Sequence, residues 1–165
     1  MADSKPVRAG NWLLDRALEG LANHDGVVIP GTTYFTFTEP AWDAVSQDIS
    51  SDCAAQLTVW AQQVYPSAPV FPVQAQSLIR CGVPWVGVYL VQLVRCAPTI
   101  NDEGGTDPAE VDAANAALLN EAWWISQRIA CQFGHDWEGT IGLVTSTGVL
   151  GDRMGANIPV TIDLS

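Results

Sequence analysis

Basic residues are scarce in this chain: it contains 7 Lys and Arg against 18 Asp and Glu, and its formal net charge is −11. A protein that grips nucleic acid neutralises phosphates with clustered Lys and Arg. The charge therefore argues against a nucleic-acid-binding function. It remains compatible with a protein that DNA slides past, because an acidic wall repels phosphates, and it also favours solubility.

Long hydrophobic runs are missing as well. The most apolar stretch, "CGVPWVGVYLVQLVRC" (81–96), contains Pro84, Gln92 and Arg95 and is shorter than the roughly 18 apolar residues of a membrane-spanning helix. The start, "MADSKPVRAGNWLLD", has no apolar segment of the kind that secretion signals carry. The sequence therefore predicts neither a membrane span nor a signal peptide.

Cysteine and histidine are too few and too scattered for a structural zinc site. The chain has 4 Cys and 2 His, and no two cysteines form a C-x-x-C pair. If residues 83–95 are extended, Cys81 and Cys96 lie roughly 50 Å apart, which is too far for a disulfide. Reduced thiols are the default for a chain without a secretion signal. The alternative is a Cys53–Cys96 bridge, which an antiparallel pairing of the two strand-like runs would allow.

The common catalytic motifs are also missing: the sequence contains no G-x-S-x-G, G-x-x-x-x-G-K, H-E-x-x-H or G-x-G-x-x-G. One polar cluster, "FGHDWEG" (133–139), groups His135, Asp136 and Glu138, and a base or metal ligand could be built there. It follows a predicted helix, however, where a histidine interacts favourably with the helix dipole. We therefore expect a structural role, and no catalytic residue, cofactor or metal site.

Helical patterns occur twice. Leu14, Leu18 and Leu21 share one stripe of a short helix predicted over 11–22, with Asn11 as its N-cap. A long helix is predicted over 108–133. Asp107 is its expected N-cap, because Pro108 and Glu110 follow at the positions that proline and a capping-box glutamate prefer.

Alternating patterns predict five strands, within 32–40, 53–66, 83–95, 140–148 and 150–164. The third is apolar on both faces and therefore needs cover on both. We expect the long helix on one face and a neighbouring element or subunit on the other. Pro159 predicts that the last strand lies at a sheet edge or carries a bulge.

Together these elements predict an α+β fold, in which a mostly antiparallel sheet packs against one long and one short helix. The chain length fits a single domain over residues 1–165, with residues 1–9 as a flexible N-terminus. The connections 38–52, 65–82 and 97–107 are longer than a compact monomer needs, and long loops often bind partners.

Tryptophan is abundant, with 7 in the chain. Trp123 and Trp124 are adjacent on one predicted helix, so they cannot both face the same core. Surplus aromatic surface is typical of assembly. Trp85, Trp123 and Trp124 are therefore the predicted interface residues.

In order and pattern, the chain resembles the small head-to-tail connector proteins of long-tailed phages that infect actinobacteria, and its layout is similar to that of tail terminators. The resemblance covers roughly residues 10–164. It rests on "LLDRAL", "DCAAQLTVWAQQVYP", "IRCGVPWVGVYLVQLVRCAP", the helix capped by Asp107 and Pro108 with its internal Cys131, and "IPVTIDL".

The resemblance implies a structural virion protein without enzyme activity. Such a protein forms a homo-oligomeric ring, a hexamer in tail terminators, at the head–tail joint. The ring caps the tail tube, contacts the tail tube protein and the head connector or stopper, and lets DNA pass without specific binding. It would be assembled in the cytoplasm of the bacterial host.

Three classes of function remain open from the sequence. The first is this virion assembly protein, as a terminator or as another neck connector, a stopper or a tail tube subunit. Stoppers tend toward small barrels with little helix, so the long helix favours a terminator. The second is an interaction domain of a different system, and the third is a small enzyme that uses His135.

Overall fold

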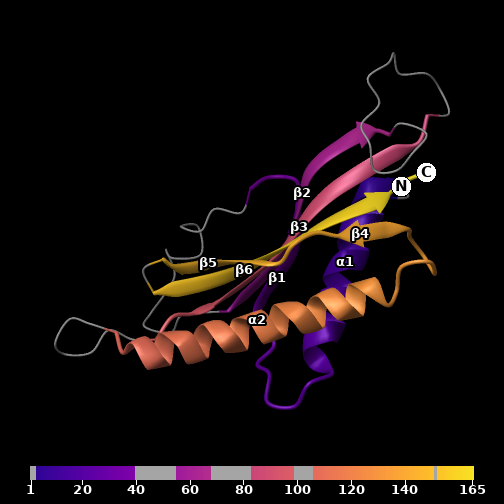
Figure 1. Ribbon diagram of the computed structural model, residues 1–165. Coiled ribbons are helices and arrows are strands. Elements are labelled where there is room, and N and C mark those ends of the chain that lie inside the picture. The colour runs from indigo at the N-terminus through magenta and orange to yellow at the C-terminus, as the bar shows by residue number, and fades with distance from the viewer. Residues whose placement is uncertain (1–2, 40–54, 68–82, 99–105, 151) are drawn as a thin grey trace.

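The computed structural model describes residues 3–39, 55–67, 83–98, 106–150 and 152–165. Two helices, α1 (Lys5–Ala22) and α2 (Pro108–Ala130), pack against one six-stranded sheet (Figure 1). The predicted α+β fold with a mostly antiparallel sheet is confirmed. The strands are β1 (Thr32–Thr36), β2 (Gln56–Pro66), β3 (Trp85–Cys96), β4 (Gly139–Ile141), β5 (Thr145–Leu150) and β6 (Arg153–Asp163).

The sheet has the order β1-β2-β3-β6-β4, and β5 pairs with β6 beside β4. All pairs are antiparallel except β1 with β2, which is parallel. Among the described strands, β1 therefore forms one edge of the sheet, and β4 and β5 share the other edge end to end.

The core lies between the helices and one face of the sheet. Alternate residues of the three central strands face the helices and are buried, as the period of two requires. From the helices, Leu13, Leu21, Leu118, Ile125 and Ile129 complete this cluster. No described helix lies on the second face, yet Val94 and Gln92 there are only 3% and 8% exposed. Strand β3 is thus buried on both faces, and its helix side contacts both helices rather than the long one alone.

Several predicted boundaries were wrong. Helix α1 begins at Lys5 rather than at Asn11, so residues 5–9 are helical; Pro6 occupies the first turn, which suits its fixed φ, and Ala9 is buried. The single strand predicted over 140–148 is two strands, β4 and β5. Helix α2 ends at Ala130, about one turn before the predicted end.

Pro159 does not lie at a sheet edge, because β6 pairs with β3 along its whole length. On its other side, β6 pairs with β4 from Val160 and with β5 up to Asn157. The nitrogen of Pro159 therefore faces the gap between β4 and β5. No strand there needs a backbone N–H from this position, so the proline costs the sheet no hydrogen bond. Its carbonyl still accepts a hydrogen bond of 2.8 Å from the N–H of Gly142.

Tyr89 ties the first turn of α1 to the centre of the sheet. Its ring is fully buried, and its hydroxyl donates a hydrogen bond of 3.0 Å to the carbonyl of Pro6. Burial raises the pKa of the Tyr89 phenol well above its ordinary value, because the phenolate would lose its hydration.

We expect Tyr89→Phe to lower the free energy of unfolding by about 1 kcal/mol near neutral pH, the value of one hydrogen bond. The raised pKa also predicts that the wild-type free energy of unfolding falls as the pH rises above about 10, since the unfolded phenol then releases a proton that the folded one keeps. Urea denaturation across this range measures both. Equal alkaline slopes in the two proteins would contradict this role of Tyr89.

Candidate functional site

The outward face of α2 carries no charge along most of its length. Between residues 113 and 130, every exposed position is uncharged, although solvent-facing helix surfaces are normally rich in charged side chains. Leu119 and Trp123, one turn apart, are 40% and 57% exposed. The exposed positions are Ala113, Ala116, Ala117, Leu119, Asn120, Trp123, Gln127 and Ala130.

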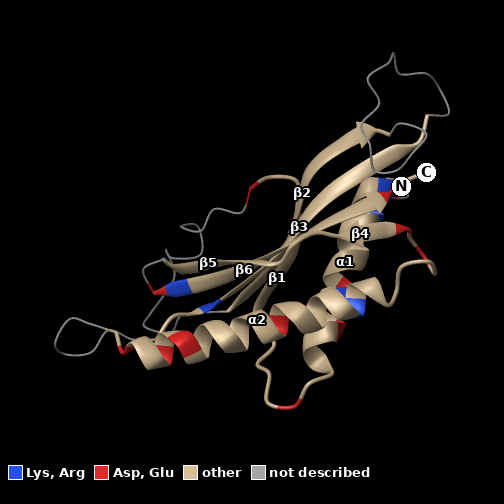
Figure 2. Cartoon of the chain, viewed as in Figure 1, with Lys and Arg blue, Asp and Glu red and all other residues tan. Residues whose placement is uncertain are grey.

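The charged residues of this helix segment turn inward instead. Glu121 accepts a hydrogen bond of 2.7 Å from Arg95 of β3 within an ion pair. Arg128 pairs with Glu19 of α1 at 2.6 Å. Figure 2 shows the remaining charges of α2 near its N-terminal end. The outer face is left to small and apolar side chains, which is typical of a surface that another chain covers.

The adjacent tryptophans of α2 have different environments, as their spacing predicts. Trp124 is half-buried and stacks on His24, with ring centroids 3.9 Å apart and planes 15° apart. Trp123 projects from the outer face. Trp123 is therefore the tryptophan of this pair that is available to a partner, whereas Trp124 holds the end of α1 against α2.

Trp85, the third predicted interface residue, belongs to a different surface. It is 38% exposed at the start of β3. With Pro6, Val64 and Leu164 it lines an apolar hollow of about 240 Å³ close to both chain ends. The structure thus separates Trp85 from the α2 surface, and the interface roles of all three tryptophans stay predictions.

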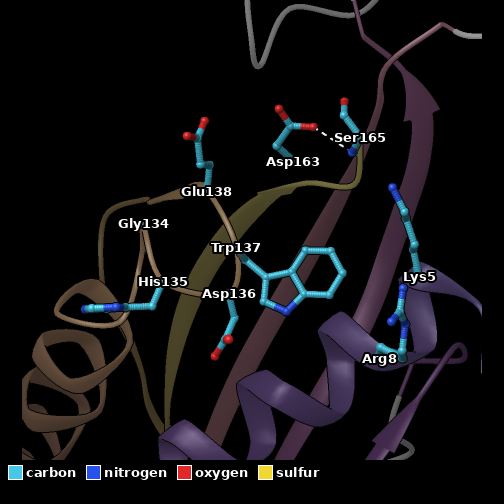
Figure 3. A pocket seen from close by; sticks show the side chains of 9 residues that line it. All are labelled: Lys5, Arg8, Gly134, His135, Asp136, Trp137, Glu138, Asp163 and Ser165. Carbon is cyan, nitrogen blue, oxygen red and sulfur yellow. Dashed lines mark hydrogen bonds between the residues drawn. The ribbon is translucent and has the colours of Figure 1, made fainter.

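The polar cluster after α2 lines an open hollow of about 510 Å³ (Figure 3). Lys5 and Arg8 of α1 lie on one side of it. His135 lies on the other side, and its ring points away from them. The lining residues are Lys5, Arg8, Gly134, His135, Asp136, Trp137, Glu138, Asp163 and Ser165.

Structural contacts account for the two central residues of this cluster. The Asp136 carboxylate accepts a hydrogen bond of 3.1 Å from the Trp12 indole N–H, and Trp137 packs against the core. Glu138 points away from both (Figure 3). Within the described part of the chain, no three His, Cys, Asp or Glu side chains are placed to hold a metal ion. These side chains diverge, and the geometry offers no nucleophile and base in contact.

The cysteines are described only in part. Cys131 is a free, exposed thiol at the C-cap of α2. Cys96 is disulfide-bonded, which differs from the reduced state expected by default. Cys53 and Cys81 lie outside the described residues, so the Cys53–Cys96 pairing stays a prediction. No helix among the described residues is long and apolar enough to span a membrane.

Comparisons with known proteins give no further guide to this surface. Neither a scan against protein-family models nor a search of curated proteins finds a match for the chain.

Proposed function

We propose that this chain is a structural virion protein that forms a ring at the head–tail joint of a long-tailed phage and acts as the tail terminator. The main support for the proposal is the uncharged outer face of α2, on which Trp123 and Leu119 are exposed although the net charge of the chain is −11. A surface of this kind is suited to assembly rather than to catalysis. The sequence resemblance supplies the assembly in which it would act.

The charge distribution supports a role around DNA. An excess of carboxylates lets DNA pass through a ring without sticking, because phosphates and carboxylates repel each other. In this proposal the ring caps the tail tube on one side, where it ends tube growth. On the other side it contacts the connector or stopper of the head. The chain has no enzymatic step in this role.

The helix content supports a terminator over a stopper. Helix α2 contains 23 residues and α1 contains 18, and both cover a single sheet. Stoppers are expected to be small barrels with little helix, as the resemblance implies. A tail tube subunit is the remaining alternative within the same assembly.

Deletion of the coding sequence from the phage genome tests the proposal. Without a terminator, nothing ends the growth of the tail tube, so we expect tails that exceed normal length and do not join heads. Electron microscopy of the lysate measures tail lengths directly, and supplying the intact gene in trans should restore joined particles. Tails of normal length beside unjoined heads would identify a stopper instead, and a lack of tails would identify a tube subunit. Intact infectious particles would exclude the whole proposal.

A further inference from the structure

Exposed apolar side chains lie in or beside the chain segments that form the two opposite edges among the described strands. Nine large hydrophobic residues are exposed in the described part of the chain. Val28 (72%) and Ile29 (43%) lead into β1, and Phe37 (55%) follows it. Leu143 (81%) and Val149 (41%) lie in the segment that joins β4 to β5 and in β5 itself.

Leu119 and Trp123 of α2 lie along the same edge as Leu143. The side chain of Asn115 in α2 accepts a hydrogen bond of 3.4 Å from Ser146 of β5. Further along the chain, the ring of Phe133 lies against Gly139 of β4. The α2 stretch between these two contacts therefore runs beside the segment 142–144. We call Leu119, Trp123, Leu143 and Val149 the β5 surface, and the edge of β1 with Phe37, which packs on Phe35 of β1, the β1 surface.

Both edges are also free of charge. Between Asp25 and Glu39 the sequence contains no charged residue, and there is none between Glu138 and Asp152. Natural proteins usually protect an exposed edge strand with lysine, proline or an inward charge. Neither β1 nor β5 contains any of these, although β5 carries one irregularity between Ser146 and Gly148. Edges like these are expected where another strand covers them.

The strand directions fit a pairing of the two edges with each other. Strand β1 runs parallel to β2, and each following step from β2 through β3 and β6 to β5 is antiparallel. Strands β1 and β5 therefore run in opposite directions. When copies stand side by side in one orientation, β1 of one copy meets β5 of the next in the antiparallel sense.

We propose that the ring is built head to tail, with the β1 surface of one copy against the β5 surface of the next. The occupant of each edge is a second copy, because the two surfaces match in chemistry and strand direction, and because uncharged edges let strongly acidic chains approach. Such a contact uses different surfaces on its two sides, and it closes into a ring when the rotations between copies complete a full turn. A pairing of two β5 surfaces would leave every β1 surface uncovered. This inference rests on the proposed ring.

Two single variants and their mixture test the polarity of the contact. Leu143→Glu places a charge on the β5 surface and Phe37→Glu places one on the β1 surface. Both positions are more than half exposed, at 81% and 55%, so the fold of one chain should tolerate the change. Gln63→Glu is the control, since Gln63 is exposed on β2, outside the segment of β2 that pairs with β1.

The purified proteins are compared by native mass spectrometry and analytical ultracentrifugation, up to their highest soluble concentration. We expect the wild type and the Gln63→Glu control to form rings. Each edge variant alone should associate about 30-fold more weakly or worse, the effect of losing one dominant interface side chain. An equimolar mixture of the two should form a heterodimer and nothing larger, because each variant keeps one intact edge.

Three outcomes would overturn the head-to-tail contact. Rings that persist in both variants would place the interface elsewhere. A Phe37→Glu dimer that Leu143→Glu abolishes would indicate paired β5 surfaces. A wild-type protein that stays monomeric would exclude self-association through these edges. None of these decides the proposed function, which the gene deletion tests independently of any ring in solution.

Discussion

Ile125→Ala should lower the free energy of unfolding by about 2–5 kcal/mol, the usual range for truncating a buried isoleucine. Ile125 is 0% exposed and belongs to the core between α2 and the sheet. It also lies at a close approach of the two helices. A Cβ built on Gly20 of α1 would be 3.0 Å from the Ile125 Cα and 3.2 Å from the Trp124 carbonyl. Because the two helices are already this close, they cannot easily move to fill the cavity that Ile125→Ala would leave.

Equilibrium urea denaturation measures this loss at protein concentrations too low for assembly, since assembly would add to the apparent stability. Leu119→Ala is the matched control on the same helix, because Leu119 is 40% exposed and contributes little to the core. We expect the control to change the free energy of unfolding by less than about 1 kcal/mol. A loss below about 1 kcal/mol for Ile125→Ala itself would show that α2 does not form the core with the sheet as described.

The two adjacent tryptophans of α2 should have opposite roles. Trp123→Ala removes a side chain that is 57% exposed, so it should leave the melting temperature nearly unchanged but weaken ring assembly about 30-fold. Trp124→Ala removes the stack on His24 and should lower the free energy of unfolding by about 1–3 kcal/mol. Assembly at low temperature should then remain, because the outer face of α2 is intact.

Thermal denaturation and ultracentrifugation of the two variants side by side separate these effects. Each variant is the control of the other, since both lose the same side chain from neighbouring positions of one helix. A Trp123→Ala protein that assembles like the wild type would exclude Trp123 from the ring contact. A Trp124→Ala protein that is as stable as the wild type would show that the stack on His24 contributes nothing to the stability of the fold.

Local signals predicted the long helix and the last strand well. The side chain of Asp107 accepts a hydrogen bond of 3.0 Å from the N–H of Ala109, as its place before Pro108 indicates. The alternating apolar residues predicted within 150–164 form the buried face of β6. These signals lie within a few residues of the structure that they determine, so they can be read without the tertiary fold.

Long-range pairing was not predictable in the same way. Nothing local shows that β1 runs parallel to β2, or that β4 and β5 share one edge of β6. Pro159 indicated a sheet edge because proline has no backbone N–H to donate to a neighbouring strand. The gap between two short strands equally requires no N–H at this position. Only the tertiary pairing distinguishes these two solutions.

The candidate surface was predictable in part. The adjacent positions of Trp123 and Trp124 indicated that one of them turns outward, and the structure identifies it as Trp123. The uncharged sheet edges were missed, although their signal lies in the sequence as two charge-free stretches, 26–38 and 139–151. Their meaning depends on the topology, which places β1 in one stretch and β4 and β5 in the other, at the two edges among the described strands.

Electron cryomicroscopy of the intact phage particle can locate the chain and resolve the contact between its copies. We expect one ring of this chain at the head–tail joint, with β1 of each copy beside β5 of the next in the antiparallel sense. Many stacked rings along the tail, or particles that lack the chain altogether, would rule out the proposed role.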